Sequence, residues 1–242
     1  MDTTNFTGLS NFKSKLDKWA RRQLEISNPK FVKTFLSQLE KQGLEKAHDA
    51  TKSLLGDPPE WYAVLTAMAD VEMALDKMWR ARQFLGASPM PGSGELSNLG
   101  AWVDYHSDYW AFATDALLER VEILINLSID RILRYKNPEW RTLKNELLRK
   151  IKKIKDEIGN VRHPLAHGGG GGITGLEEDR LWETYLLVGS GTDLAAAKYK
   201  SISRLDYQQK WYERIGWATA IVTAVLDDVL GRLSGEKALE SP

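Results

Sequence analysis

The chain has 242 residues, 43% of them hydrophobic, and its 33 Lys and Arg side chains balance 33 Asp and Glu side chains. The length allows one large domain with a sizeable core, and the neutral balance excludes a positively charged coat over the whole protein. No cysteine is present, which excludes disulfides, thiolate metal sites and cysteine nucleophiles and is compatible with a reducing cytoplasm.

The sequence predicts neither a signal peptide nor a membrane span. Residues 1–15 lack the apolar segment of a signal peptide, and the longest uncharged apolar run, residues 215–226, is too short to span a bilayer. We therefore expect a cytoplasmic protein that has no membrane partner.

Helical patterns fill the first part of the chain. Apolar residues at helical spacing between residues 12 and 24 predict a short helix. Asn28 followed by Pro29 is typical of the N-cap and the first position of a second helix. The apolar residues of that second helix would be Phe31, Phe35, Leu39 and Leu44.

Two long helices are predicted next. Asp57 and Pro58 repeat the start signal, and the helix that follows ends near Gly86, before a loop rich in Pro, Gly and Ser. Residues 99–136 contain no proline and predict a single helix. Its second half, residues 117–133, is apolar nearly all round, so we expect it to lie centrally or to face another subunit.

A further helix is expected to begin at Asn137 and Pro138 and to end at Gly159, which would serve as its C-cap. Its apolar residues recur at steps of three and four, as on one face of a helix. They are Leu143, Leu147, Ile151, Ile154 and Ile158.

The helical signal lapses over residues 168–203. Residues 181–188 have the composition of a strand and are followed by a Gly-Ser-Gly turn, so we predict an irregular or small β-hairpin insertion here. The last helix is predicted over residues 205–233. The sequence therefore predicts an all-α protein, a multi-helix bundle with one insertion.

The segment of residues 160–167 reads Asn-Val-Arg-His-Pro-Leu-Ala-His and continues into five glycines. Arg162 is a fixed cation, and His167, five residues later, exchanges protons near neutral pH. In an unbroken helix five residues rotate by roughly 500°, so the two side chains would diverge by about 140°. We expect Pro164 to break the helix, which would let Arg162 and His167 converge within one chain or across a dimer.

This motif resembles that of the HEPN domains, helical proteins of bacterial defence and toxin systems. Their motif is an Arg, four to six residues and then a His, often with Asn, Asp or His directly after the Arg. Arg162, His163 and His167 occupy these positions here. The specific resemblance covers only about eight residues, and the helical character of the remaining chain agrees with it.

The helical pattern and the resemblance together predict one domain over residues 1–242. It would consist of an N-terminal helical extension at about residues 1–56 and a HEPN-like core at about residues 57–235. The insertion of residues 168–203 would form a flap on that core.

The resemblance implies a metal-independent endoribonuclease that acts as a toxin or defence effector. His167 would take or give a proton, Arg162 would stabilise charge on the pentavalent phosphorus, and His163 would polarise the phosphate. The resemblance also implies a homodimer whose motifs face each other across a cleft, an RNA substrate and a neutralising antitoxin protein. No cofactor and no metal ion is expected.

Other interpretations remain open. A HEPN-like protein can be a catalytically inactive scaffold that binds RNA or protein. The chain can also be an unrelated helical oligomer with a chance match of Arg to His. Within the motif, Arg162 can cap carbonyl groups at a helix end, and His167 can precede a glycine C-cap.

A basic segment precedes the motif. Residues 141–162 hold eight basic and three acidic side chains. Arg149, Lys152, Lys153 and Lys155 are therefore candidates for contacts with an RNA backbone. A solvated helix face is the alternative interpretation of the same charges.

Two further groups of side chains lie in the first half of the long helix. Asp104, Asp108 and Asp115 share one face near His106. A solvent-facing polar stripe is favoured over a role in orienting the motif arginine or holding a hard cation. Five aromatic residues are interpreted as core or subunit interface rather than as base-stacking platforms. They are Trp102, Tyr105, Tyr109, Trp110 and Phe112.

Overall fold

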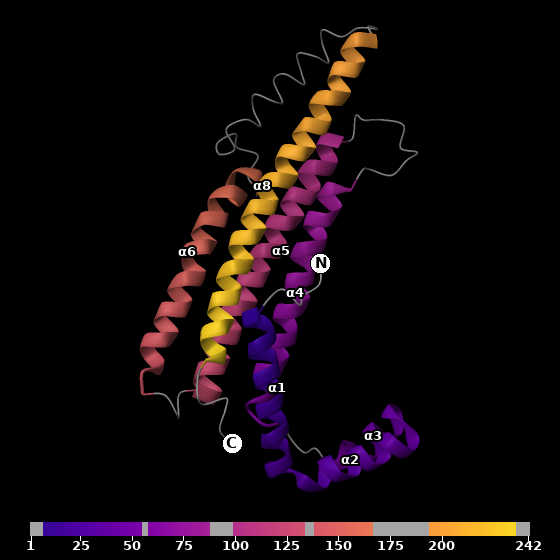
Figure 1. Cartoon of the computed structure of the whole chain (residues 1–242), viewed down its shortest axis with the longest axis vertical. Coiled ribbons are helices and arrows are strands. Elements are labelled where there is room, and N and C mark those ends of the chain that lie inside the picture. Colours follow the sequence, from indigo (N-terminus) through magenta and orange to yellow (C-terminus); the bar gives the residue numbers. More distant parts are fainter. Residues whose placement is uncertain (1–6, 55–57, 88–98, 134–137, 167–193, 236–242) are drawn as a thin grey trace. The chain divides into compact units, whose positions relative to one another are not determined.

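The computed structural model describes residues 7–54, 58–87, 99–133, 138–166 and 194–235 (Figure 1). All regular structure in these ranges is helical, which confirms the all-α prediction. Within the same ranges no helix combines the length and the hydropathy needed to cross a membrane. In chain order the elements are α1 (Thr7–Ser27), α2 (Pro29–Gln42), α3 (Leu44–Thr51), the 3₁₀-helix η2 (Lys52–Leu54), α4 (Tyr62–Gly86), α5 (Leu99–Ser128), the π-helix η4 (Ile129–Leu133), α6 (Trp140–Ala166) and α8 (Leu194–Ser234).

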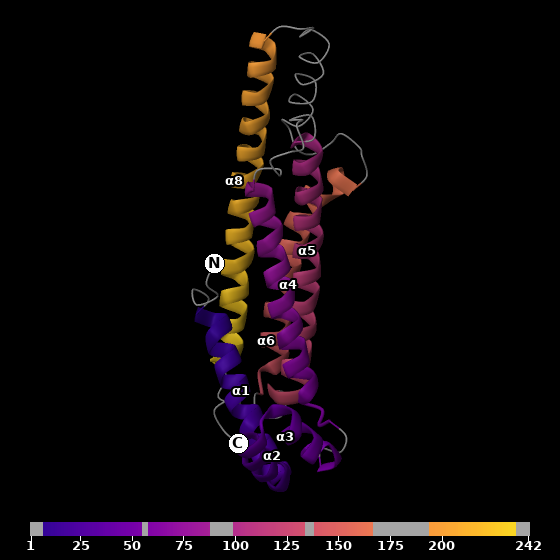
Figure 2. The same ribbon diagram turned by 90° about the vertical axis from the view of Figure 1, so that its right-hand side faces the viewer.

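The chain forms two compact units. Unit 1 contains residues 1–70, 121–148 and 225–242, and unit 2 contains residues 71–120 and 149–224. Helices α4, α5, α6 and α8 each contribute a segment to both units. Within unit 2 these segments lie side by side (Figures 1 and 2). The predicted division into an N-terminal extension and a HEPN-like core stays a prediction.

Helix α1 begins with a close contact to α8 inside unit 1. The backbone N–H of Gly8 donates to Oδ1 of Asp227 at 2.6 Å, which satisfies an amide that has no partner within α1. A Cβ atom at position 8 would lie 2.0 Å from the carbonyl oxygen of Asp227, so only glycine fits this contact. The predicted first helix is confirmed, and its apolar face is buried through Phe12, Leu16 and Trp19.

The predicted N-cap at Asn28 is confirmed. Its Oδ1 accepts a hydrogen bond from the backbone N–H of Phe31 at 3.1 Å, and Pro29 occupies the first position of α2. The prediction that this helix extends to Leu44 is wrong, because Gly43 adopts a φ of 82° and separates α2 from α3. Glycine adopts such a positive φ without the steric cost that a Cβ atom imposes.

Helix α4 begins later than its proline signal indicates. Pro58 precedes another proline, which disfavours the helical conformation at position 58. The backbone N–H of Tyr62 donates to the carbonyl of Pro59 at 2.8 Å and closes the turn before the helix. The predicted end near Gly86 is confirmed. Asp57 lies outside the described residues.

The long helix predicted over residues 99–136 is observed as α5, which η4 extends by five residues. The described chain itself covers most of the apolar second half, so this stretch gives no reason to expect a second subunit there. Ile123, which is 42% exposed, departs from this pattern. The buried side chains are Leu117, Leu118, Val121, Leu124, Ile125, Ile129, Ile132 and Leu133.

Helix α6 extends further than predicted. It ends at Ala166, so the predicted C-cap at Gly159 is wrong. The apolar spacing continues past this glycine, which favours further helix. The apolar positions concerned are Ile158, Val161 and Leu165.

Helix α8 begins at Leu194, so the predicted insertion of residues 168–203 is wrong for its final part. Three alanines follow Leu194, and alanine has the highest helix propensity of all residues. The earlier part of the insertion, including the predicted β-hairpin, lies outside the described residues.

Two hydrogen bonds join α8 to its neighbours inside unit 2. Trp110 of α5 is 1% exposed, and its Nε1 donates to Oγ1 of Thr219 at 2.9 Å. Gln208 of α8 donates through Nε2 to the carbonyl oxygen of Leu85 in α4 at 2.8 Å. The expected place of Trp110 in the core is therefore confirmed.

Candidate nucleic-acid interface

The segment of α6 in unit 2 has an apolar face and a basic face. Arg149, Lys152 and Lys153 are exposed, whereas the isoleucines between them are buried. This division confirms the amphipathic pattern predicted from the sequence. The buried residues are Ile151, Ile154 and Ile158.

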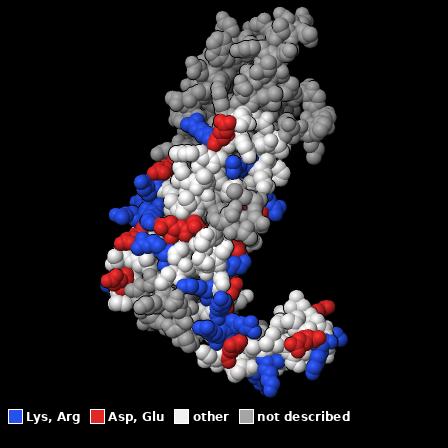
Figure 3. Space-filling model, viewed as in Figure 1, with Lys and Arg blue, Asp and Glu red and all other residues white. Residues whose placement is uncertain are grey.

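The charges of the basic face are only partly balanced. Nζ of Lys153 lies 4.0 Å from Oε1 of Glu157, one turn further along the helix. Arg149 and Lys152 have no ion-pair partner among the described residues, whereas Lys155 is half-buried and makes a contact of its own. Figure 3 shows Lys and Arg side chains interspersed with acidic ones on the side of the molecule that α6 forms. The face is therefore locally positive but not uniformly so.

The Arg/His motif lies at the C-terminal end of α6. Arg162 and His163 belong to its last two turns, and His167 lies outside the described residues. The predicted helix break at Pro164 is wrong, because α6 continues to Ala166. Pro164 lies in the last turn of α6. Because proline has no backbone N–H, only one hydrogen bond of the helix is lost there. The convergence of Arg162 and His167 therefore stays a prediction, and so do the roles of both.

The acidic positions of α5 supply no metal site among the described residues. Asp108 and Asp115 are half-buried, and each makes a contact within the chain. The side chain of Asp104 lies outside the described structure. No group of three or more His, Cys, Asp or Glu that could hold a metal ion occurs in the described ranges.

His106 occupies an aromatic cluster between α4 and α5. Its ring centroid lies 4.1 Å from that of Trp102, 5.0 Å from that of Tyr105 and 5.6 Å from that of Phe84. The residue is 7% exposed, and neither ring nitrogen has a hydrogen-bond partner in the described structure. Burial lowers the pKa of His106 below its ordinary value of 6.5, because the imidazolium would lose its hydration here.

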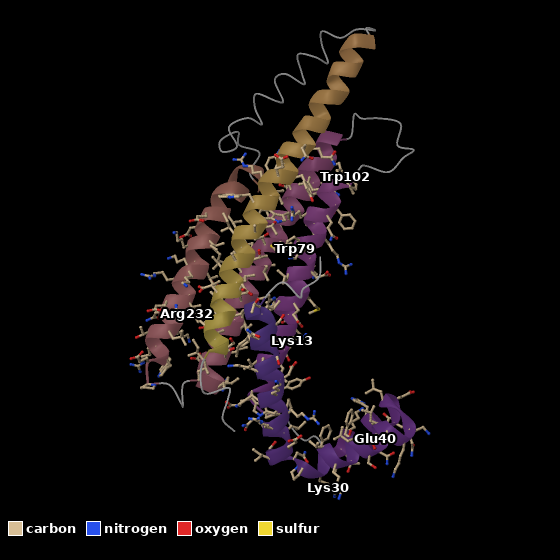
Figure 4. The ribbon with its side chains drawn as sticks, in the orientation of Figure 1. Lys13, Lys30, Glu40, Trp79, Trp102 and Arg232 are labelled. Carbon is tan, nitrogen blue, oxygen red and sulfur yellow. The ribbon has the colours of Figure 1, made fainter. Side chains whose placement is uncertain are left out.

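The outer face of α5 is aromatic. Tyr105 is 66% exposed, Tyr109 is 38% exposed and Phe112 is 50% exposed. These three side chains therefore do not lie in the core, because α5 buries the opposite face, which carries Trp110, and the alternative expectation of a subunit interface stays a prediction. Trp102 is half-buried near the start of α5 (Figure 4). A signal for this face was visible in the sequence, since the aromatic residues follow one another at steps of three and four.

Comparisons with family models, with curated proteins and with solved structures yield no match to this chain. The likeness to HEPN domains therefore remains a resemblance over Arg162, His163 and His167. A conclusion about function has to come from the residues of the site themselves.

Proposed function

We propose that this protein binds RNA along the basic face of α6 and cleaves it, without a metal ion, at Arg162, His163 and His167. The observation that carries the proposal is the exposure of Arg149 and Lys152 on a helix that leads directly to Arg162. Lysine and arginine attract the phosphates of a nucleic acid whatever its base sequence. Neighbouring cations on one helix face are suited to follow several phosphates along a strand.

Each motif residue has its own part in the proposed reaction. His167 takes the proton of a ribose 2′-hydroxyl while the 2′-oxygen attacks the adjacent phosphorus, or gives a proton to the leaving 5′-oxygen. The bond from phosphorus to the 5′-oxygen breaks, a 2′,3′-cyclic phosphate forms, and water makes the one of these two proton transfers that His167 does not make. Arg162 stabilises the charge on the pentavalent phosphorus through its planar pair of N–H donors, and His163 polarises a phosphate oxygen.

The proposal includes a homodimer. The resemblance to HEPN domains supports it, because the motifs of two copies would face each other across a cleft in such a dimer. A ribonuclease acting as a cytoplasmic toxin or defence effector would also need a neutralising antitoxin. No cofactor takes part in the proposed reaction.

A catalytically inactive HEPN-like scaffold is the second candidate. The observation that favours it is the continuation of α6 past Pro164 to Ala166, because the expected helix break, which would have let the motif side chains converge, is not found in the described residues. Both candidates bind RNA through α6. They differ in whether the bound RNA is cleaved.

Charge reversal on α6 tests the binding step. In the double variant Lys152→Glu/Lys153→Glu we expect at least about a tenfold loss of affinity for single-stranded RNA. We also expect a slope of log affinity against log salt that is shallower by about 0.7 for each lost phosphate contact. Fluorescence anisotropy with a labelled RNA over a range of salt concentrations measures both quantities.

The double variant Lys30→Glu/Lys33→Glu is the matched control. It introduces the same change of charge at exposed positions of α2, and we expect it to keep the wild-type affinity and salt slope. Equal losses in the two double variants, or a wild-type protein that binds no RNA, would refute the role of the α6 face.

A further inference from the structure

Helix α5 carries a line of uncharged side chains on its outer face, which we call the α5 seam. The residues follow one another at steps of three, four, three and four, the heptad spacing by which helices pair in coiled coils. All of them belong to unit 2. The seam consists of Trp102, Tyr105, Tyr109, Phe112 and Ala116.

The aromatic side chains along the seam form an exposed apolar patch. Tyr105, Tyr109 and Phe112 are joined by Phe84 of α4, which is 49% exposed and contacts the same histidine ring as Tyr105. Four aromatic side chains of about this exposure leave roughly 400 Å² uncovered, which lies within the roughly 300–600 Å² of the largest patch on a typical monomer, a patch that often has a function. Two copies paired here would cover roughly 800 Å² of aromatic surface, so a stable interface of roughly 1,200–2,000 Å² would also have to include the polar edges.

Helix α4 borders the seam on one side and makes that edge basic. The ring of Phe84 stacks on His106, and its carbonyl oxygen accepts a hydrogen bond from Nε1 of Trp102 at 3.2 Å. Arg80 and Lys77 lie about one and two turns before Phe84 on the same face of α4, and both are exposed. Arg80 also pairs with a carboxylate on its own helix, at 2.7 Å.

The other edge of the seam is acidic. His106, on the side of α4, is rotated by roughly 100° from Tyr105 around the helix axis, whereas Asp108 is rotated by about 60° in the opposite sense. Asp115 follows seven residues later at nearly the same angle. The two half-buried carboxylates therefore border the seam on the side away from α4.

We propose that the α5 seam pairs with the α5 seam of a second copy of this chain, with the two helices parallel. A twofold axis along the seam places each seam side chain opposite its own copy. It also places Lys77 and Arg80 of each copy on the same side as Asp108 and Asp115 of the other. Arg80, Asp108 and Asp115 keep contacts within their own chain as well. An antiparallel pair would instead place like edges opposite each other. The inference deepens the proposed homodimer by naming its contact surface.

Single cysteines report this pairing directly, because the chain has none of its own. Tyr105→Cys and Ala116→Cys are oxidised at micromolar concentration, and disulfide-linked dimers are scored on a non-reducing gel. Residues held together in a dimer have millimolar effective concentrations, so we expect both variants to cross-link about a hundredfold faster than free collision allows. Trp217→Cys is the control, since Trp217 is 70% exposed on α8 in the same unit and should cross-link only by collision.

Cross-linking at only one seam position, or at neither position faster than in Trp217→Cys, overturns the parallel pairing. Light scattering is the second measurement. The wild type should give twice the monomer mass of 27.4 kDa, and a Tyr109→Glu variant with wild-type helix content should give the monomer mass. A monomeric wild type, or a variant that stays dimeric, also overturns the proposal. Both measurements omit RNA, so their outcome is separate from that of the RNA-binding test.

Discussion

Unit 1 and unit 2 differ in how completely the polar side chains between their helices are paired. In unit 1, Nζ of Lys144 in α6 lies 2.9 Å from Oδ2 of Asp130 in η4. Nη2 of Arg232 in α8 lies 2.6 Å from Oε2 of Glu146 in α6. The carboxylate of Asp227 in the same unit accepts from the first turn of α1. These contacts join separate elements of the unit by directional bonds.

Unit 2 also has directional bonds between helices, from Trp110 to Thr219 and from Gln208 to Leu85, but several of its buried polar atoms have no hydrogen-bond partner in the described structure. They include both ring nitrogens of His106, Nε of Arg82 and Oγ of Ser107. The Arg82 guanidinium lies instead over two aromatic rings, at 5.5 and 5.0 Å from their centroids. Ser128 is the corresponding exception in unit 1.

Directional contacts fix how helices are placed along each other, whereas contacts between rings and aliphatic side chains tolerate small shifts. Surface ion pairs add little stability, so the difference concerns specificity of packing more than its strength. We therefore expect unit 1 to resist changes at its helix crossings and unit 2 to absorb changes near His106 and Arg82, where buried polar atoms have no partner. Unit 2 also carries the basic face of α6 and the seam.

Gly8→Ala is expected to have the largest effect on stability. The new Cβ would lie 2.0 Å from the backbone oxygen of Asp227, so the two helices must move apart. Overpacking of this kind costs about 1–3 kcal/mol in the free energy of unfolding, which urea denaturation measures. Gly231→Ala is the matched control, because its Cβ would meet Gly8 at an ordinary 3.8 Å. Equal losses in the free energy of unfolding of the two variants would show that the close approach at Gly8 does not cause the effect.

The burial of His106 should make stability fall in acid. Its pKa is lowered below 6.5 in the folded state, so below about pH 6.5 the unfolded chain binds more protons and the free energy of unfolding decreases. In His106→Phe the fall in melting temperature from pH 8 to pH 5 should be smaller than in the wild type, which thermal unfolding measures. His48→Gln, at an exposed position of α3, should keep the wild-type profile. Parallel profiles for wild type and His106→Phe would be evidence against a buried, neutral imidazole.

Gly216→Ala in unit 2 should have the smallest effect. Its Cβ would lie 2.9 Å from Nη2 of Arg82, the flexible end of a long side chain that can move. Replacing a helical glycine by alanine contributes about 0.5–1 kcal/mol of stability, so we expect a net change below about 1 kcal/mol in urea denaturation. A loss as large as that of Gly8→Ala would mean that unit 2 is as tightly fixed as unit 1.

The sequence predicts the helices well where a local signal decides them. The Asn28 cap and the buried face of α1 depend on neighbouring residues alone, and both are observed. Gly43 and Gly159 show the limit of that reasoning. Both are glycines near a predicted helix end, yet Gly43 adopts a positive φ and Gly159 lies within α6. The continuing apolar face distinguishes the two positions, and composition alone does not.

The sequence predicts the candidate site less completely. The basic face of α6 follows from spacing, and the exposure of Lys152 and Lys153 agrees with it. The aromatic surroundings of His106 depend on Phe84 from another helix, which no local pattern reveals. The outer face of α5 has a local signal in the steps of three and four between its aromatic residues, but whether that face is covered depends on the neighbouring helices.

RNA cleavage in the presence of a chelator tests the proposed activity most directly. General acid–base transfer contributes about 10²- to 10⁴-fold, so His167→Ala should lose at least about a hundredfold in rate. Arg162→Lys keeps the charge but not the planar pair of donors and should lose a comparable factor, whereas Arg120→Lys, at an exposed position of α5, should cleave at the wild-type rate. A folded Arg162→Lys or His167→Ala protein that cleaves RNA as fast as the wild type would contradict the assignment of this site.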